Sequence, residues 1–273
     1  MTPDLREAER VVRELTFSTF VFEIRLGHHL GYVRTFASPR VARLLARSGQ
    51  IERDPVRRGG DTGLFLYELL HHGLDSPQGR DIVERVNAMH ARWHFRDDDA
   101  RWVLSTFVVP AVRIVERFGW RPLTDGEATA LMTWYRELGV RLGVPDLPAD
   151  LPAFRAETDA YEAEHLAPTE QGLRLLAATR DLLVEALPRP ARPVLLAAAG
   201  ELFEEPARSA LGLHRPGPAV RRLTLAGLRL RAWRRRRRGP ADTSWFVPGA
   251  PNTAYPDGYR LEDLGRASGT VPD

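Results

Sequence analysis

Helix start and stop signals follow one another along most of the chain, and no strand pattern interrupts them. Ser38-Pro39 has the form of a helix N-cap followed by proline, and Ser48-Gly49 ends the same helix. Thr124 and Glu127 have the spacing of a capping box, in which two side chains satisfy backbone N–H groups of the first turn. We find no sustained period-two alternation and no Asn-Gly or Asp-Gly hairpin between β-branched runs. The sequence therefore predicts an all-α protein.

The same signals set the limits of the expected helices. An arginine-rich loop is expected over residues 50–60, and the prolines at 145, 148 and 152 mark a second loop. Asp61-Thr62 is expected to open the helix after the first loop, and Asp97 to Asp99 are expected to cap a later one. The expected helices span residues 39–48, 61–73, 77–95, 97–119, 124–143, 153–166, 169–186, 192–203 and 219–236.

The length and composition favour one large domain followed by a tail. The chain has 273 residues, of which 43% are hydrophobic and 27% charged, and this is an ordinary balance for a protein with a sizeable core. We expect a multi-helix domain over residues 1–238 and an irregular Pro/Gly-rich tail over residues 239–273. The tail is held in place only if its aromatic residues dock on the body. These aromatic residues are Trp245, Phe246, Tyr255 and Tyr259.

Two residue types are missing, and their absence excludes several chemistries. The chain has no cysteine, which excludes disulfides, iron–sulfur clusters, thiolate-bound haem and cysteine nucleophiles. It also has no lysine, because all 39 basic residues are arginine, and this excludes Walker-A phosphate binding and Schiff-base chemistry. Catalysis by side chains must come from His, Asp, Glu, Arg, Ser, Thr or Tyr.

Positive charge is concentrated in one segment near the end of the chain. Residues 221–238 contain nine arginines and no acid; the net charge is +3, so the remainder carries −6. Leucines and Trp233 alternate with these arginines, as in a basic amphipathic helix over residues 219–238. Such a segment is a packed helix with a solvated end, a contact for an anionic membrane surface, or a surface that binds the phosphates of a nucleic acid. The nucleic-acid alternative is the least favoured of the three.

The sequence offers no targeting or membrane-spanning signal that we recognise. The N-terminus carries acids from the start, and no apolar run approaches the roughly 20 residues that cross a bilayer. The longest candidate, residues 102–112, stops at Arg113. We therefore expect a cytoplasmic protein, or one that is peripheral to the inner face of a membrane.

His90 is the histidine that the helical pattern places best for chemistry. Val83, Val86 and His90 are spaced by three and four residues, so His90 is expected on the buried stripe of its helix, with His94 one turn further on. A buried imidazole needs a hydrogen bond, a metal or a cofactor. Spacing alone leaves open whether His90 is a ligand or an ordinary core histidine with a hydrogen-bond partner.

Arg58, Asp61 and Thr62 form the second candidate group. They share one face at i, i+3 and i+4 if this turn is helical. A helix cap and a surface ion pair would explain the same residues without any function.

Two Glu-x-x-His pairs suggest a different metal site. Di-iron carboxylate bundles use two such pairs together with two further glutamates, all facing inward. The pairs here are Glu68–His71 and Glu162–His165, and the second lies in a polar stretch. A di-iron enzyme is therefore kept as an alternative.

An ordered set of short motifs resembles a known family. Asp61-Thr62 opens a helix that ends at Gly73, Asn87-x-x-His90 follows, and Phe118-Gly-Trp-Arg-Pro-Leu-Thr124 comes next. Glu127, Trp134, Gly139 and Gly143 complete the set. In this order they resemble the family of MpaB and the latex-clearing (rubber) oxygenases, over residues 17–222.

The resemblance implies a globin-like helical core that binds haem b and uses O₂ to act on a small apolar substrate such as an isoprenoid. It implies His90 as the proximal iron ligand. Haem propionates favour arginine, and Arg92 and Arg96 flank the end of this helix, while His94 would bond a propionate or steer the ligand helix. The family's rubber oxygenases carry Arg-x-x-Lys-Thr on the other side of the haem, where this chain has Arg58-x-x-Asp61-Thr62. Arg58 and Thr62 would donate hydrogen bonds there, and Asp61 would orient Arg58 or relay a proton. The missing lysine puts rubber cleavage itself in doubt.

The expected function is therefore a haem-dependent oxygenase that oxygenates or oxidatively cleaves a carbon–carbon double bond. Two alternative functions are compatible with the same all-α fold. One is a haem protein that senses redox state or sequesters haem without catalysis, and the other is an all-α module that binds an anionic membrane surface through residues 221–238.

Overall fold

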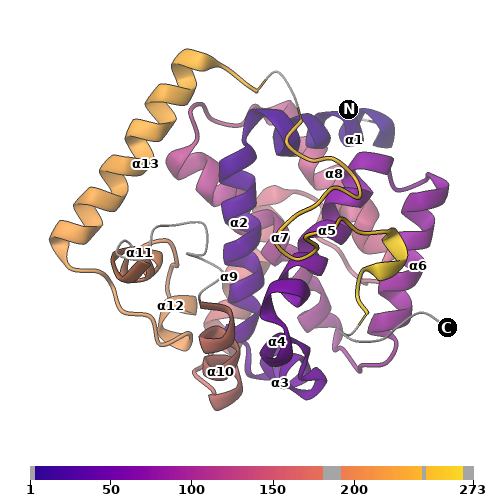
Figure 1. Cartoon of the computed structure of the whole chain (residues 1–273), viewed down its shortest axis with the longest axis horizontal. Coiled ribbons are helices and arrows are strands. Elements are labelled where there is room, and N and C mark those ends of the chain that lie inside the picture. The colour runs from indigo at the N-terminus through magenta and orange to yellow at the C-terminus, as the bar shows by residue number, and fades with distance from the viewer. Residues whose placement is uncertain (1–3, 181–191, 242–243, 267–273) are drawn as a thin grey trace.

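The structure, a computed structural model, describes residues 4–180, 192–241 and 244–266 (Figure 1). Within these residues there are thirteen α-helices and no strand, so the all-α prediction is confirmed. The α-helices are α1 (Leu5–Glu14), α2 (Val21–Arg34), α3 (Pro39–Ser48), α4 (Gln50–Arg53), α5 (Pro55–His72), α6 (Pro77–His90), α7 (Asp97–Phe118), α8 (Asp125–Arg141), α9 (Leu151–His165), α10 (Glu170–Thr179), α11 (Arg192–Ala199), α12 (Ala207–Ala210) and α13 (Pro218–Arg238).

Three short turns complete the described structure. A π-helical turn (η1, Leu15–Thr19) joins α1 to α2, and a 3₁₀ turn (η2, Thr35–Ala37) follows α2. A second 3₁₀ turn (η5, Leu261–Asp263) lies in the tail. The expected helix over residues 169–186 is found up to Thr179, and its last part lies outside the described residues.

The centre of the molecule is the close packing of α2 against α7 (Figure 1). A Cβ atom added at Gly31 would lie 1.8 Å from the carbonyl oxygen of Thr106, and one added at Gly27 would lie 2.2 Å from the Cα of Ala111. Only glycine allows the two backbones to approach this closely. The remaining helices pack around this pair, and α13 runs along the outside of the bundle (Figure 1).

Several helix limits agree with local capping signals. Ser38 and Ser76 cap α3 and α6, and Thr124 with Glu127 forms the expected capping box at the start of α8. Two expectations were wrong. The loop expected over residues 50–60 is instead α4 and the first turns of α5, because Asp54 caps α5 and Pro55 occupies its first position. Asp61 and Thr62 therefore lie inside α5 and do not cap it.

The tail is irregular over most of its described length, and its aromatic residues dock on the body. Phe246 stacks on Phe17 with ring centroids 5.2 Å apart, and the Trp245 indole N–H donates to the Thr16 carbonyl at 3.1 Å. The guanidinium of Arg25 lies 4.3 Å from the ring centroid of Trp245. These contacts cover η1, whose π-helical turn leaves carbonyl oxygens without the usual α-helical partners.

A buried polar cluster lies next to the α2–α7 contact. His28 is 6% exposed, and its ring nitrogens lie 3.1 Å from the Tyr135 hydroxyl and 3.4 Å from the Tyr67 hydroxyl. Burial lowers the pKa of His28 from 6.5 to about 3, and the neighbouring His29 adds to this shift. The imidazole is therefore neutral in the folded protein.

This shift predicts a pH dependence of stability. The unfolded chain binds a proton at His28 below about pH 6.5 and the folded protein does not, so the stability that His28 contributes is lost as the pH falls toward 3. We expect the variant His28→Leu to reduce the slope of the unfolding free energy by about 1.4 kcal/mol per pH unit in this window. Urea unfolding at several pH values checks this. The same change at the exposed His214 is the control, and equal slopes in both variants would contradict the assignment.

Candidate functional site

The α5–α6 hairpin brings Arg58 and His90 together at one end of the bundle. The two helices are joined by a short connection after Gly73, so the first turns of α5 lie beside the last turn of α6. Burial lowers the pKa of His90, and the positive charge of Arg58 lowers it further. His90 is nevertheless accessible to solvent.

The apolar stripe of α6 opens toward solvent as it approaches His90. Ile82 is fully buried and Val83 is 8% exposed, whereas Val86 and Met89 are only partly buried. His90 follows on the same face and is exposed, so the expectation that it is buried was wrong. The protein packs fully against the beginning of this stripe and leaves its end uncovered.

On α5 the three candidate residues make two separate hydrogen-bond contacts. The Arg58 guanidinium donates to the Thr62 hydroxyl at 2.5 Å, as their i, i+4 spacing allows. Asp61 is 3% exposed and accepts a hydrogen bond at 2.5 Å from the Tyr255 hydroxyl, in the tail. Arg58 and Thr62 thus form one unit, and Asp61 is held mainly by the tail.

The charge of Asp61 is balanced by its surroundings. Burial raises the pKa of this carboxyl, while the hydrogen bonds from Tyr255 and the Gly265 backbone N–H, and then the charges of Arg58 and Arg57, oppose the rise. Asp61 therefore influences Arg58 through charge, without a direct hydrogen bond between them.

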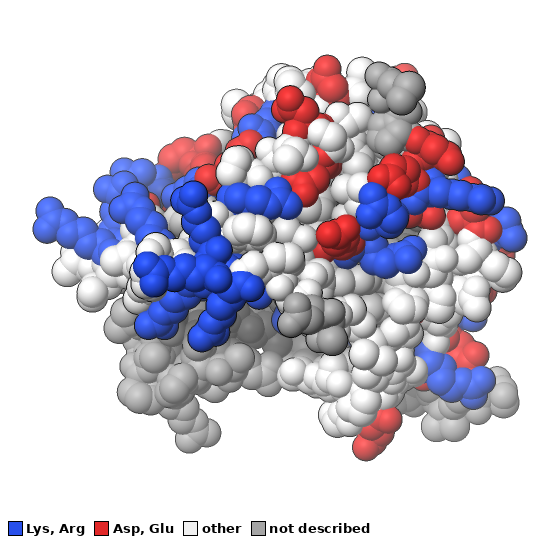
Figure 2. Space-filling view, turned by 90° about the horizontal axis from the view of Figure 1, so that it is seen from above, with Lys and Arg blue, Asp and Glu red and all other residues white. Residues whose placement is uncertain are grey.

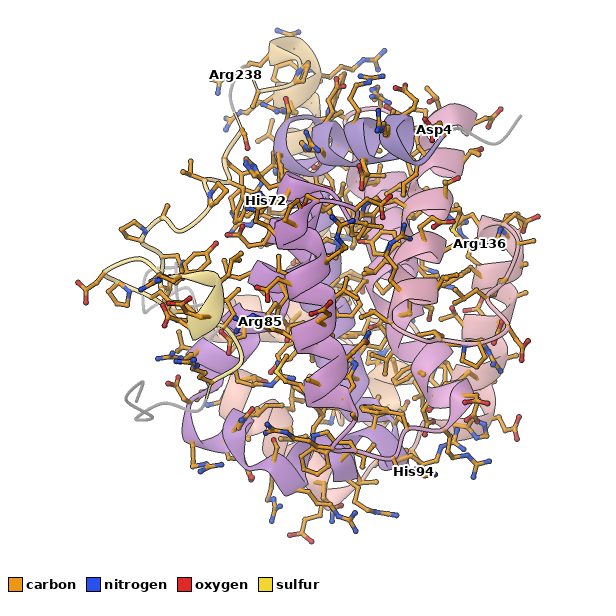
Figure 3. All side chains as sticks on the ribbon, turned by 90° about the vertical axis from the view of Figure 1, so that its right-hand side faces the viewer. Asp4, His72, Arg85, His94, Arg136 and Arg238 are labelled. Carbon is orange, nitrogen blue, oxygen red and sulfur yellow. The ribbon has the colours of Figure 1, made fainter. Side chains whose placement is uncertain are left out.

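The tail forms one wall beside the candidate site. A Cβ added at Gly60 would lie 2.5 Å from the Cβ of Ala254, so this position of α5 accepts only glycine while the tail is docked. The Tyr259 hydroxyl donates to Glu68, two turns after Asp61 on the same helix. In Figure 3 the tail runs along one side of the molecule, past His72 and Arg85.

Arg92 and His94 lie in the connection between α6 and α7. The helix that contains His90 was expected to continue to about residue 95, but α6 ends at His90. The placement of His94 one helical turn after His90 was therefore wrong. Both side chains are exposed, and His94 is labelled near the lower edge of Figure 3. Phe95 lies near the candidate ligand, with its ring centroid 5.5 Å from that of His90.

Tyr32 is a member of the site that the sequence did not reveal. Its hydroxyl is buried and has no hydrogen-bond partner among the described residues. Burial raises the pKa of Tyr32; the charge of Arg58 lowers it and that of Asp61 raises it, so Tyr32 lies near both. Tyr32 comes from the end of α2, far from α5 in sequence, and no local spacing links them. A buried hydroxyl without a partner costs about 1–3 kcal/mol, and this makes it a candidate contact for a bound group.

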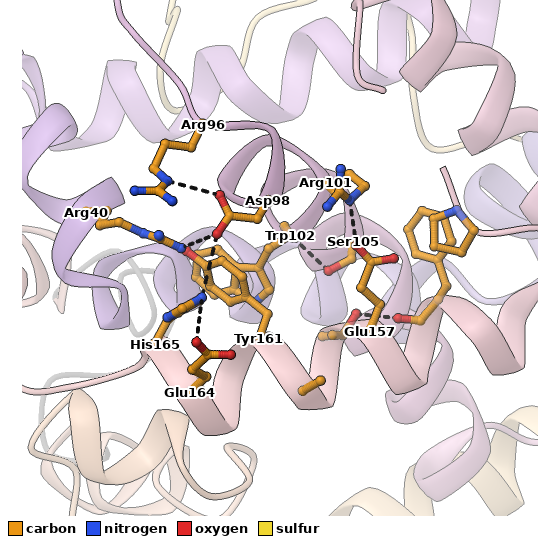
Figure 4. Close-up of a pocket in the computed structure, with 14 residues that line it drawn as sticks. Arg40, Arg96, Asp98, Arg101, Trp102, Ser105, Glu157, Tyr161, Glu164 and His165 are labelled. Carbon is orange, nitrogen blue, oxygen red and sulfur yellow. Dashed lines mark hydrogen bonds and ion pairs between the residues drawn. The ribbon is translucent and has the colours of Figure 1, made fainter. Parts of the chain in front are cut away.

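A hollow of about 400 Å³ lies between α7 and α9 (Figure 4). Its charged residues are already paired: Arg40 lies 2.7 Å from Asp98, and Arg101 lies 2.6 Å from Glu157. His165 lines this hollow, with its ring 4.8 Å from that of Tyr161. The charges that line the hollow are therefore neutralised by ion pairs within it. None of the candidate site residues lines this hollow.

The structure does not bring the two Glu-x-x-His pairs together as a di-iron site. Glu162 is buried and lies 2.9 Å from the Arg34 guanidinium, so its charge is already paired. Glu68 accepts from Tyr259 and lies 3.1 Å from His72. In the part of the chain that the structure describes, no group of three or more His, Asp or Glu residues is placed to hold a metal ion.

The fold and the site define a class of protein: an all-α domain in which an accessible imidazole at the end of an apolar stripe lies within the electrostatic influence of an arginine. The particular family follows from comparison with known sequences. The family model described as "ER-bound oxygenase mpaB/B'/Rubber oxygenase, catalytic domain" matches residues 26–237, and the chain belongs to this family. The resemblance stated from the sequence is thereby confirmed, as is the prediction of an oxidoreductase at the level of the family.

Three fungal relatives are similar to the chain. An "ER-bound oxygenase mpaB'" of Penicillium brevicompactum is 25% identical over 230 residues, which are 78% of this chain and 54% of that protein. An "ER-bound oxygenase mpaB" of Penicillium roqueforti (strain FM164) is 26% identical over 223 residues, 75% of each chain. A third, from Penicillium brevicompactum, is 27% identical over 59% of this chain and 46% of that protein. The chain thus spans about half the length of two of these relatives.

These relatives correct the expected localisation. All three are named ER-bound, which points to association with a membrane, so the expectation of a cytoplasmic protein is contradicted. Among the helices that the structure describes, none has the length and apolar character needed to cross a bilayer.

The Tyr255–Asp61 contact can be tested by removing one hydroxyl. We expect Tyr255→Phe to lower the unfolding free energy by about 1–3 kcal/mol, because a buried carboxylate loses a donor. The pKa of Asp61 should rise further, and proteases should cut the tail faster. Urea unfolding and limited proteolysis measure these effects. Tyr32→Phe is the matched control, since its hydroxyl has no partner to lose, and equal destabilisation by both changes would show that the contact is unimportant.

Proposed function

We propose that this chain is a haem b-dependent oxygenase that uses O₂ to oxygenate or cleave a carbon–carbon double bond in an apolar substrate such as an isoprenoid. One observation carries the proposal. Arg58, which donates to Thr62, lies near enough to lower the pKa of His90 at the end of the α6 apolar stripe, within the residues that match the oxygenase family. We propose residues 1–238 as the haem-binding domain, with residues 239–273 as the tail that closes one side of it.

The residues of the site suit a planar, largely apolar group held by one imidazole. The pKa of His90 is lowered, so its ring is neutral near pH 7 and a nitrogen lone pair is free to bind a metal. Val86 and Met89 offer apolar surface that the protein leaves partly uncovered. The buried Tyr32 hydroxyl without a partner supplies a polar contact. These features support haem binding, which calls for one neutral imidazole and an apolar slot.

In this proposal His90 is the iron ligand, and Arg92 and His94 bind the propionates. Both lie just beyond the end of α6 and are exposed, so their side chains are free to turn toward carboxylates. Bound haem would supply the activation of O₂, and the protein would supply position and electrostatics.

Arg58 and Thr62 are the proposed hydrogen-bond donors on the side of the haem opposite His90, where O₂ would react. The bond between them fixes the guanidinium, so its remaining N–H groups point in defined directions. Asp61 acts as a positioning residue: its carboxylate lies close enough to influence Arg58 and is itself held by the tail. A lysine at this position, as in the rubber oxygenases, would place a positive charge where this chain has a negative one.

The apolar character of the site supports an apolar substrate. Phe95 lies next to His90, and Val86 and Met89 on α6 are only partly buried, so apolar side chains are available near the imidazole. The names of the relatives support a place of action next to a membrane, where apolar molecules dissolve.

Replacing the proposed ligand should remove the cofactor. We expect His90→Ala to lose the haem absorption band and to bind added hemin at least tenfold more weakly, because no other imidazole of this helix is available. Absorption spectra and hemin titration of the purified full chain measure this. His214→Ala is the control: it removes an exposed histidine outside the site and should keep full haem content. Full haem content in His90→Ala would overturn the ligand assignment.

Replacing the proposed donors should separate catalysis from haem binding. We expect Arg58→Gln and Thr62→Val to keep the haem and to lower O₂ uptake with an isoprenoid such as squalene by roughly a hundredfold to a thousandfold, the range for a lost donor to developing charge. Oxygen-electrode and haem-content measurements on the same samples test this. Haem binding without any substrate-dependent O₂ uptake in the unmodified protein would favour a haem carrier or redox sensor instead.

A further inference from the structure

The helix α13 presents an outer face that the rest of the protein does not cover. None of its residues is buried. Its large apolar side chains are unusually open: Leu223 is 70% exposed, Leu230 47% and Trp233 50%. Helical spacing puts these three on one face, since they are separated by seven and by three residues. Exposed apolar side chains that cluster in this way mark an interaction site.

Arginines surround this apolar face. Arg234 and Arg237 follow Leu230 and Trp233 by one helical turn, and the guanidinium of Arg237 lies 4.0 Å from the centroid of the Trp233 ring. Five arginines of α13 have no ion-pair partner among the described residues; they are Arg222, Arg229, Arg234, Arg236 and Arg238. Figure 2 shows blue side chains gathered on one side of the molecule and extended away from it.

The opposite face of α13 is tied to the body. Arg231 lies 2.6 Å from the buried Glu23, and Arg221 lies 3.0 Å from Glu201. Arg235 donates to the carbonyl oxygen of Ser18 at 2.7 Å. Three arginines thus fix the orientation of the helix, and the apolar face with its unpaired arginines is held outward.

We propose that the outer face of α13 docks the protein on the surface of an anionic lipid bilayer. The unpaired arginines match the negative charge of the headgroups, and Leu223, Leu230 and Trp233 enter the boundary between headgroups and acyl chains. A nucleic acid would be matched by the arginines alone and would gain little from exposed leucines. The combination of both side-chain types on one face therefore favours lipid. This inference stands on α13 alone and does not depend on the proposed oxygenase activity.

The experiment is co-sedimentation of the full chain with vesicles. Phosphatidylcholine vesicles containing about one third phosphatidylglycerol are compared with pure phosphatidylcholine vesicles at low and high ionic strength. We expect binding to the anionic vesicles only, weakened by salt. The variant Arg234→Gln/Arg236→Gln/Arg237→Gln/Arg238→Gln should weaken binding by about tenfold or more. It leaves Arg235 in place, so the anchor to Ser18 remains.

A second variant tests the apolar part of the face. Leu223→Ala/Leu230→Ala/Trp233→Ala keeps every arginine and should also weaken binding by tenfold or more. The matched controls change exposed residues elsewhere: Arg6→Gln/Arg43→Gln/Arg47→Gln/Arg80→Gln for the charge, and Val140→Ala/Leu173→Ala/Val247→Ala for the apolar area. Both controls should bind like the unmodified chain, and circular dichroism confirms that each variant is folded.

Three outcomes would overturn the proposal. The first is no binding to anionic vesicles, and the second is equal binding by all variants. The third is salt-sensitive binding to an oligonucleotide that is tighter than vesicle binding and survives loss of the three apolar side chains, which would make α13 a nucleic-acid surface.

Discussion

The close contact of α2 and α7 is the constraint on which the rest of the arrangement depends. With glycine at positions 27 and 31, the backbone of α2 packs directly on the backbone of α7 at the centre of the molecule. This contact places His28 deep enough to stay neutral and brings the end of α2, with Tyr32, beside the first turns of α5. A larger side chain at Gly31 would separate the helices and move Tyr32 away from Arg58.

The tail supplies hydrogen-bond donors to buried groups of the helical body. Its Trp245 satisfies a carbonyl of the π-helical turn, and its Tyr255 and Tyr259 satisfy the buried acids Asp61 and Glu68. One face of α5 therefore binds the tail, while the adjacent face carries Arg58 and Thr62, and the charge of Arg58 lowers the pKa of His90. The electrostatics of the candidate site depend on residues that are distant in sequence, because hydrogen bonds from the tail oppose the rise that burial causes in the pKa of Asp61.

Local signals predicted much of the fold, and contacts between distant segments account for what was missed. Serine and threonine caps fixed the starts of α3, α6 and α8, because a cap acts within one turn. The helix face shared by Arg58 and Thr62 was predicted from spacing. The end of α6 at His90 has no glycine or proline to announce it, and the partner of Asp61 lies 194 residues away. The unpaired hydroxyl of Tyr32 likewise follows from packing, which a linear pattern does not contain.

The long span between α5 and the tail has a consequence for how the protein is made. Asp61 and Glu68 leave the ribosome early in synthesis, whereas Tyr255 and Tyr259 emerge about 190 residues later. Until then both acids on α5 face water and the wall beside Arg58 is open. The α5 side of the candidate site is therefore complete only after nearly the whole chain has been synthesised.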